Sequence, residues 1–303
     1  MPSLQRHPLA WVFVGSLAAT LVYFFGFLKL YGGRAIADWA AIRWRPEYNQ
    51  EHSWLVPFLF LFLIWFHRKE LKAAPKAPDY RGLLLVGLGI VFYVVAARAL
   101  QPRLAIFSLS FFVLGITIYL WGPKVGRMMV FPSAMLLFMI PLAAIEQATF
   151  RLQFLVTGVI EFLSKLIGIQ ISTVGTTLKA ADGSWGFDIA EGCSGIRSLI
   201  AIVMLTAMYV HVFEKQFWKK VLILAFSGVF AVIGNAGRIF TIIVLAKLGF
   251  PGFAGGIYHD YSSFIFFPIA LLAMISFAKL LNIRLNKAAR RASPVAKQVS
   301  YDY

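Results

Sequence analysis

The stretch KVLILAFSGVFAVIGNAGRIFTIIVLA, residues 220–246, decides the fold class. After Lys220 at its start, it is apolar or small almost throughout, and its two strongly polar side chains are Asn235 and Arg238. A helix needs about 20 predominantly apolar residues to cross about 30 Å of hydrocarbon. The stretch therefore predicts a transmembrane helix that carries a charge inside the membrane.

Similar runs recur along the chain, which is 60% hydrophobic and 14% charged, with a mean hydropathy of +0.76. A soluble domain carries about a quarter charged residues. We therefore predict an all-α integral membrane protein with about eight transmembrane helices and a small extracytoplasmic segment between spans five and six. The candidate spans are 9–31, 53–67, 82–100, 104–121, 128–145, 194–212, 220–246 and 261–281.

The formal net charge of +16 is distributed unevenly over this topology. With both termini in the cytoplasm, the inner segments hold seventeen Lys and Arg against four acidic residues, and the outer segments hold ten against nine. This is the positive-inside pattern of cytoplasmic membrane proteins. It accounts for the basicity without a nucleic-acid partner, and it makes membrane lipid the expected partner of the basic cytoplasmic tail, 282–303.

We expect one multi-pass membrane domain over residues 1–303, with 146–192 as its extracytoplasmic loop. Helical spacing of aromatic residues predicts a helix from Glu146 to Gly168 that lies along the membrane interface. Beyond it, β-branched residues and the turn pair Asp182-Gly183 predict a short hairpin that leads directly into Cys193. That cysteine is the only one in the chain, so no internal disulfide can form.

Three polar residues fall at span ends or inside a span, where a charge or thiol is informative. From a rise of ~1.5 Å per residue, Cys193 lies roughly 28 Å above the inner boundary, Arg238 roughly 27 Å and His259 roughly 34 Å. The three side chains therefore share a depth near the outer face. The hydrophobic pattern does not require this agreement, so we predict a common site.

The residues around the cysteine suit nucleophilic chemistry. Glycines at 192 and 195 permit close approach of a substrate backbone. The expected helix N-terminus supplies unpaired N–H groups and partial positive charge, which lower a thiol's pKa and favour the thiolate. Arg197, four residues after Cys193, is expected one turn deeper on the same helix face. Glu191 and Asn235 are further candidates for supporting or substrate-binding roles, as is His52 near the second span.

In this interpretation, His259 acts as general base to the thiol and general acid to a leaving amine, and Arg238 stabilises the oxyanion of a tetrahedral intermediate. Structural readings of the same residues remain open. A lone cysteine at a helix start is ordinarily a small buried side chain. An intramembrane arginine more often pairs with an acid or with carbonyl groups, and Glu191 or Asp260 could be that acid. Whether Arg197 or His259 is the closer partner of Cys193 is undecided. We expect no cofactor and no metal, because one cysteine and scattered acids give no recognisable ligand set.

The same residues carry a family resemblance, from roughly residue 40 to 282. The run Gly192–Leu199 resembles the cysteine signature of the exosortase/archaeosortase family. Asn235–Ile239 is similar to that family's Asn-x-x-Arg segment, and His259 falls where bacterial members have their histidine. Glu51–Pro57, which contains His52, resembles a His-Gly motif of the family.

The resemblance implies a membrane cysteine transpeptidase or protease of the cell inner membrane, with its site at the extracytoplasmic face. Its expected partners are exported proteins with a C-terminal sorting signal of the PEP-CTERM kind: a short motif, a membrane span and a basic cluster. The acceptor of the acyl group is water or a lipid- or glycan-linked group. The chain departs from the family pattern at Ser53 and Ser263, where glycine is usual. These departures remove no reactive group and leave the subfamily and its sorting motif open.

Two functions from other classes compete with this prediction. A transporter or assembly factor for exported polysaccharide would line an anion path with Arg197, Arg238 and His259. Such a path should show polar groups across the whole membrane thickness, whereas these residues gather near one face. The other alternative is an inactive homologue that binds sorting signals without cleaving them.

Overall fold

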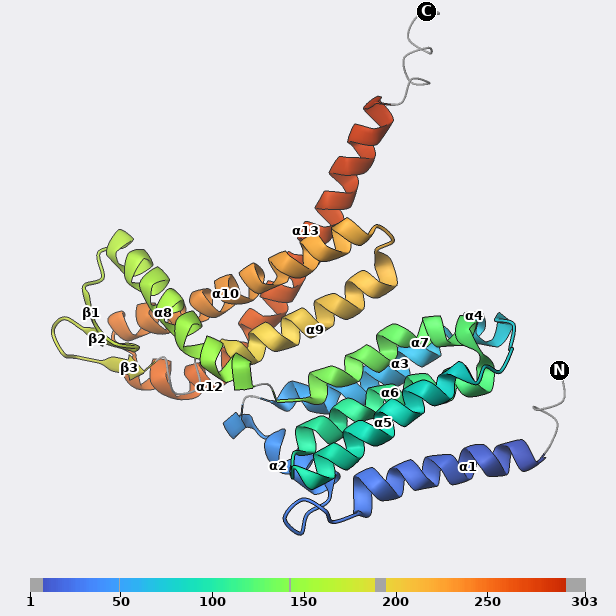
Figure 1. Ribbon diagram of the computed structural model, residues 1–303. Helices are drawn as coiled ribbons and strands as arrows, with labels where there is room; N and C mark the ends of the chain where they lie inside the picture. The colour runs from blue at the N-terminus through green and yellow to red at the C-terminus, as the bar shows by residue number, and fades with distance from the viewer. Residues whose placement is uncertain (1–7, 49, 142, 189–194, 293–303) are drawn as a thin grey trace, which may run out of the picture. The chain divides into compact units, whose positions relative to one another are not determined.

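The computed structural model describes residues 8–292 except 49, 142 and 189–194 (Figure 1). The chain divides into two compact units, Met1–Ala143 and Ala144–Tyr303. Each unit is described by itself below.

The first unit consists of helices joined by short turns. Its closest helix pair is the antiparallel α5 and α6, where glycines replace side chains at the crossing: a Cβ on Gly82 would lie 2.4 Å from the carbonyl oxygen of Gly115. The helices are α1 (Pro8–Val22), α2 (Ile36–Arg43), α3 (Val56–Phe66), α4 (Arg68–Ala73), α5 (Arg81–Arg98), α6 (Pro102–Trp121) and α7 (Pro123–Met135). A π-helical turn follows α1 at Tyr23–Phe27, and 3₁₀ turns lie at Pro46–Tyr48, Glu51–Leu55 and Leu136–Met139.

The predicted fifth span, 128–145, is not one continuous helix. Helix α7 ends at Met135, and the chain continues as a 3₁₀ turn before α8 begins at Ala143. Pro141 explains the break, because a proline disfavours the helical conformation of the residue before it. That residue, Ile140, is extended, with φ −91° and ψ 117°.

The second unit combines long helices with a small sheet. Figure 1 shows α9, α10 and α13 side by side, and α8 next to the three strands. The elements are α8 (Ala143–Leu166), β1 (Ile171–Val174), β2 (Thr177–Ala180), β3 (Gly186–Asp188), α9 (Ile196–Phe213), α10 (Phe217–Lys247), α11 (Pro251–Phe253), a π-helical turn (Ala254–Tyr258), α12 (His259–Tyr261) and α13 (Ser263–Ala292).

Five helices in the described part of the chain are long and apolar enough to cross a membrane: α5, α6, α9, α10 and the segment Ser263–Ile283 of α13. They match five of the predicted spans, so the multi-pass membrane class is confirmed. The first two predicted spans correspond to shorter apolar helical segments, Gly15–Phe27 and Glu51–Phe66. The total of eight spans and their orientation stay predictions.

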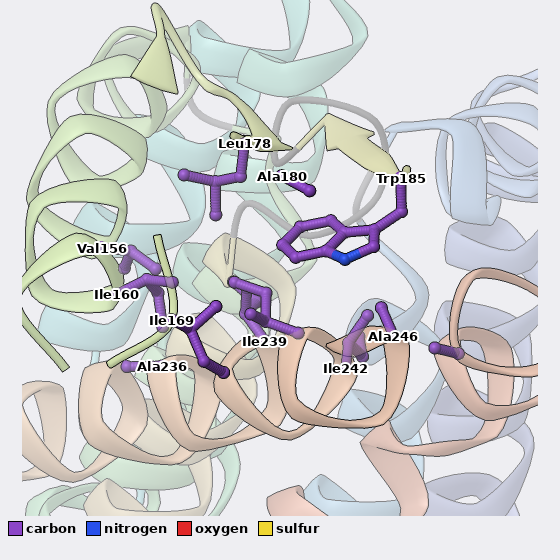
Figure 2. Packing of buried hydrophobic residues seen from close by; sticks show 12 residues of the cluster. Val156, Ile160, Ile169, Leu178, Ala180, Trp185, Ala236, Ile239, Ile242 and Ala246 are labelled. Carbon is purple, nitrogen blue, oxygen red and sulfur yellow. The ribbon is translucent and has the colours of Figure 1, made fainter. Parts of the chain in front are cut away.

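The extracytoplasmic segment of the prediction folds onto the C-terminal half of α10. Figure 2 shows Val156 and Ile160 of α8 together with Leu178 and Trp185 of the sheet region on one face of α10. The α10 side of this cluster consists of Ala236, Ile239, Ile242, Ile243 and Ala246. The predicted helix and the turn at Asp182-Gly183 are confirmed. The sheet has three antiparallel strands in the order β1-β2-β3 rather than the two of a hairpin.

Candidate active site

The chain returns to α10 after a tight reversal. Gly249, with φ +94°, follows the end of α10, and the short helix α11 leads into the π-helical turn Ala254–Tyr258. Within that turn, Gly256 leaves helical geometry, at φ −100° and ψ −110°. The reversal brings His259 of α12 back to Arg238, which precedes it by 21 residues.

Arg238 is held by two neutral oxygens. It is buried, with 8% of its surface exposed. Its Nε donates to Oγ of Ser262 at 2.9 Å, and its Nη2 donates to the backbone carbonyl of His259 at 2.9 Å. Among the described residues, no carboxylate forms an ion pair with Arg238 and none accepts from its Nη1. Because a buried cation without a counter-charge attracts an anion, this geometry suits a site where negative charge develops.

His259 contacts the acid next to it in the chain. Its Nδ1 lies 3.1 Å from Oδ1 of Asp260, and its side chain is 26% exposed. When Nδ1 carries the ring proton, the Nδ1–H group donates a hydrogen bond to this carboxylate, and Nε2 is then the basic nitrogen of the ring. Asp260 therefore contacts the histidine and is not the partner of Arg238 that the structural reading of the sequence allowed.

Three hydroxyl groups around Arg238 were missed by the sequence analysis. Ser262 is 1% exposed, accepts from Arg238 and donates to the carbonyl of His259 at 3.1 Å. On the other side, Tyr258 donates to Oγ1 of Thr241, which donates to the carbonyl of Arg238, both at 2.8 Å. The one available signal was a serine three residues after His259, at the start of an apolar span.

The start of α9 packs against α10 one turn before Arg238. Gly195 is the N-cap of α9 and has φ +69°, and a Cβ built on it would lie 2.7 Å from Nδ2 of Asn235. Both the backbone conformation and the close approach therefore require glycine. Oγ of Ser198 donates to the carbonyl of Gly195 at 2.9 Å and secures this first turn.

Cys193 and Glu191 lie outside the described residues. In the sequence, Cys193 comes two residues before Gly195, and Gly195 is the residue that the structure places against Asn235. Arg197 lies in the first turn of α9 and is exposed. The one-turn spacing expected between Cys193 and Arg197 stays a prediction, because the described helix α9 begins at Ile196 and does not include Cys193.

His52 belongs to the first unit, where it is buried in the 3₁₀ turn Glu51–Leu55. Its buried Nδ1 has no hydrogen-bond partner among the described residues, and beside it Oγ of Ser53 donates to the carbonyl of Phe138 at 3.3 Å. Nearby, Nε1 of Trp44 donates to the carbonyl of Met139 at 3.1 Å. The bonds of Ser53 and Trp44 hold the 3₁₀ turn that follows α7, and the supporting or substrate-binding role of His52 stays a prediction.

A small pocket lies between α9, α10 and α13, directly beside Arg238. Its cavity volume is about 20 Å³, roughly the room that one water molecule needs. Among the described residues, no group of three or more His, Cys, Asp and Glu side chains is placed to hold a metal ion. The pocket beside Arg238 is lined by Ser198, Ile202, Ala231, Gly234, Asn235, Arg238, Ser263, Phe266, Phe267 and Ala270.

The comparison with protein families identifies the family of this chain. The family model described as transmembrane exosortase (Exosortase_EpsH) matches residues 44–276. The matched region includes α9, α10 and the His259 segment, and the chain belongs to the transmembrane exosortase family. Neither the comparison with curated proteins nor that with solved structures gave a match.

Proposed function

We propose that this chain is a membrane-embedded cysteine transpeptidase or protease that removes a C-terminal sorting signal from exported proteins. The signal is of the PEP-CTERM kind, with a short motif, a membrane span and a basic cluster. Membership of the transmembrane exosortase family supports this class of activity. The reaction passes through an acyl-enzyme on Cys193.

In the first step, the Cys193 thiolate attacks the carbonyl carbon of the scissile bond, and His259 holds the thiol proton. Arg238 stabilises the oxyanion of the tetrahedral intermediate. When this intermediate collapses, the C–N bond breaks and His259 gives the proton to the leaving amine. A thioester remains. Water, or a hydroxyl or amine of a lipid- or glycan-linked acceptor, then attacks the thioester and gives its proton to His259, and the C–S bond breaks to release the thiolate.

The observation that carries the proposal is the attachment of Arg238 to the His259 segment. Two hydrogen bonds of 2.9 Å, to Ser262 and to the His259 carbonyl, fix a buried guanidinium beside the proposed proton carrier. Neutral acceptors leave the positive charge without neutralisation by a described acid.

We place the protein in the cell inner membrane, with cytoplasmic termini and the site at the extracytoplasmic face. Reporters fused after Ala74, after Gly122 and at the C-terminus should then be cytoplasmic, and a reporter near Asp182 should be exterior. A cytoplasmic position of Asp182 would put the site in the wrong compartment for exported substrates.

The decisive experiment removes the nucleophile. Cys193→Ala should abolish processing of a co-expressed substrate while the protein remains abundant in the membrane, and Cys193→Ser should be nearly inactive, because a hydroxyl is much harder to deprotonate than a thiol. Since the chain has a single cysteine, a membrane-impermeant alkylating reagent reports its exposure alone. Full processing by the alanine variant would exclude the covalent mechanism.

A further inference from the structure

The segment that carries His259 is attached to α10 at two neighbouring places. At the first, Nη2 of Arg238 donates to the carbonyl of His259 at 2.9 Å. At the second, the Tyr258 hydroxyl donates to Oγ1 of Thr241 at 2.8 Å. Arg238 and Thr241 are three residues apart on one face of α10, and Tyr258 and His259 are adjacent in the chain. The two contacts therefore fix the His259 segment to a single turn of α10.

The secondary structure of this segment does not hold the His259 ring by itself. Helix α12 has three residues, and the π-helical turn before it contains the non-helical Gly256. A single helical turn has little stability of its own. The bonds to the His259 carbonyl and to Ser262 both come from the guanidinium of Arg238. Tyr258 adds an attachment at a second residue of α10, which restricts rotation of the segment about the first.

The Tyr258 hydroxyl is committed to this contact. Thr241 donates its one hydroxyl proton to the carbonyl of Arg238 at 2.8 Å, so its oxygen accepts the hydrogen bond from Tyr258. The Tyr258 ring packs against the buried cluster formed by α8, the sheet region and α10. Because its proton is used inside the protein, the phenol suits a positioning task rather than proton transfer.

The π-helical turn is also held from the side of the sheet. A Cβ built on Gly255 would lie 2.7 Å from Cε1 of Phe187, which belongs to β3. The Phe187 ring stacks on Trp185, with ring centroids 5.5 Å apart, so it has little freedom to move away. The neighbouring Ala254 is fully buried in the same cluster. The backbone of the turn therefore lies between an aromatic ring of β3 and the hydroxyl contact on α10.

We infer that Tyr258 is a positioning residue for the reaction: its hydroxyl, bound to Thr241, holds the His259 imidazole in the direction that proton transfer with Cys193 requires. The inference rests on the proposed function. Tyr258 acts through His259 and needs no contact with the substrate. Phe187 supports the same turn from the opposite side.

The first test measures turnover of purified, monodisperse variants on a cleavable reporter. Tyr258→Phe keeps the ring and removes the hydroxyl, and it should lower kcat about 2- to 10-fold with KM near the wild-type value. In a His259→Ala background the same change should have no further effect, because the group that it positions is gone. Thr241→Val should match Tyr258→Phe, the double variant should be no slower than either single variant, and Thr241→Ser should recover the rate.

Tyr93→Phe is the matched control, because the Tyr93 hydroxyl donates to the carbonyl of Phe24 at the same distance, 2.8 Å, within the first unit. It should keep the wild-type rate. Wild-type turnover of Tyr258→Phe would refute the positioning role. An equal loss in the wild-type and His259→Ala backgrounds would refute it too, because Tyr258 would then act independently of the histidine.

A glycine pair tests the same turn without changing a hydroxyl. At position 255 a new Cβ meets the Phe187 ring, whereas at position 252 it has no atom within 4 Å. Gly255→Ala should therefore lower kcat as Tyr258→Phe does, and Gly252→Ala should not. Equal rates for the two alanine variants would show that the seat of the turn on Phe187 does not affect the histidine.

A measurement without substrate separates this inference from the proposed function. Because Cys193 is the only cysteine, the rate of its alkylation by iodoacetamide in detergent reports the thiolate as the pH is varied. His259→Ala should shift the profile towards the higher pH of an ordinary thiol, and Tyr258→Phe should shift it in the same direction by less. Charged groups that contact His259 include Asp260, at Nδ1, and Arg238, at the carbonyl, and both variants keep them.

The two possible failures differ in this measurement. An unchanged profile in His259→Ala would overturn the proposed role of His259 and this inference with it. A shift in His259→Ala with a wild-type profile in Tyr258→Phe would overturn the inference alone.

Discussion

Removal of the Ser262 hydroxyl tests how Arg238 is positioned. In Ser262→Ala, Arg238 loses the acceptor of its Nε, and the His259 carbonyl loses a donor. Hydrogen bonds to charged groups contribute about 1.5–3 kcal/mol. If Ser262→Ala removes this contribution from the stabilisation of the transition state, turnover should fall about 10- to 150-fold, since about 1.36 kcal/mol corresponds to a factor of ten.

A double-mutant cycle distinguishes positioning from simple loss of packing. Lysine at position 238 has no Nε–H at the place from which arginine donates, so Ser262→Ala should cost little when it is combined with Arg238→Lys. Ser262→Thr keeps the hydroxyl and should recover part of the rate. The readout is turnover per molecule of purified, monodisperse enzyme on a cleavable reporter.

Ser227→Ala is the matched control. Ser227 is also buried, but its hydroxyl donates to the carbonyl of Leu224 within α10, away from the site. Its rate should remain near that of the wild type. If the effects of Ser262→Ala and Arg238→Lys are additive, or if Ser262→Ala has wild-type turnover, Ser262 does not act through the guanidinium.

Three further predictions concern Arg238, Glu214 and Gly195. Arg238→Lys should keep partial activity and Arg238→Ala should lose about 10²–10³-fold in turnover; equal rates for the two variants would exclude a charge-based role. Burial raises the pKa of Glu214, but hydrogen bonds from Asn282 and two backbone N–H groups more than offset this effect, so the pKa is lowered overall. Thermal stability in detergent should therefore fall as the pH drops through the acidic range in which this carboxylate takes up a proton. Glu214→Gln should weaken that pH dependence. Gly195→Ala should lose activity, because a left-handed backbone costs an L-residue about 1–2 kcal/mol and the new Cβ meets Asn235. Gly249→Ala is the control: it has the same backbone cost, but its new Cβ has no atom within 4 Å. Equal losses of activity in both variants would show that the Asn235 contact is unimportant.

The long apolar runs were the most predictable part of the fold. Helices α5, α6, α9, α10 and α13 lie where the sequence predicts spans, because a run of apolar residues long enough to cross a membrane has few alternatives. The β1–β2 turn was missed. Val174 pairs with Thr177 across a two-residue turn at Gly175, and the β-branched residues on both sides had been assigned to a single strand.

At the site, helix rise was enough to predict that Arg238 and His259 lie at a similar depth. The atoms that meet were not predictable, because the contact uses the His259 backbone carbonyl rather than its ring. That orientation depends on the π-helical turn Ala254–Tyr258 and on the non-helical Gly256, which no periodicity in the sequence announces. The position of Cys193 relative to these groups stays a prediction.

The length of α10 explains how an arginine can be buried there with no described acid beside it. A helix of 31 residues is about 46 Å long and exceeds about 30 Å of hydrocarbon by roughly 16 Å. In the predicted topology, the excess lies at the C-terminal end, where α10 packs against α8 and a sheet region that bears charged residues such as Lys179 and Asp188. Arg238 is nine residues from the end of α10, or about 14 Å, and in that topology it lies near the hydrocarbon boundary. At that depth the cost of desolvating the charge is smaller than at the membrane centre. Neutral oxygens are then enough to hold the guanidinium, and its charge stays available for an oxyanion.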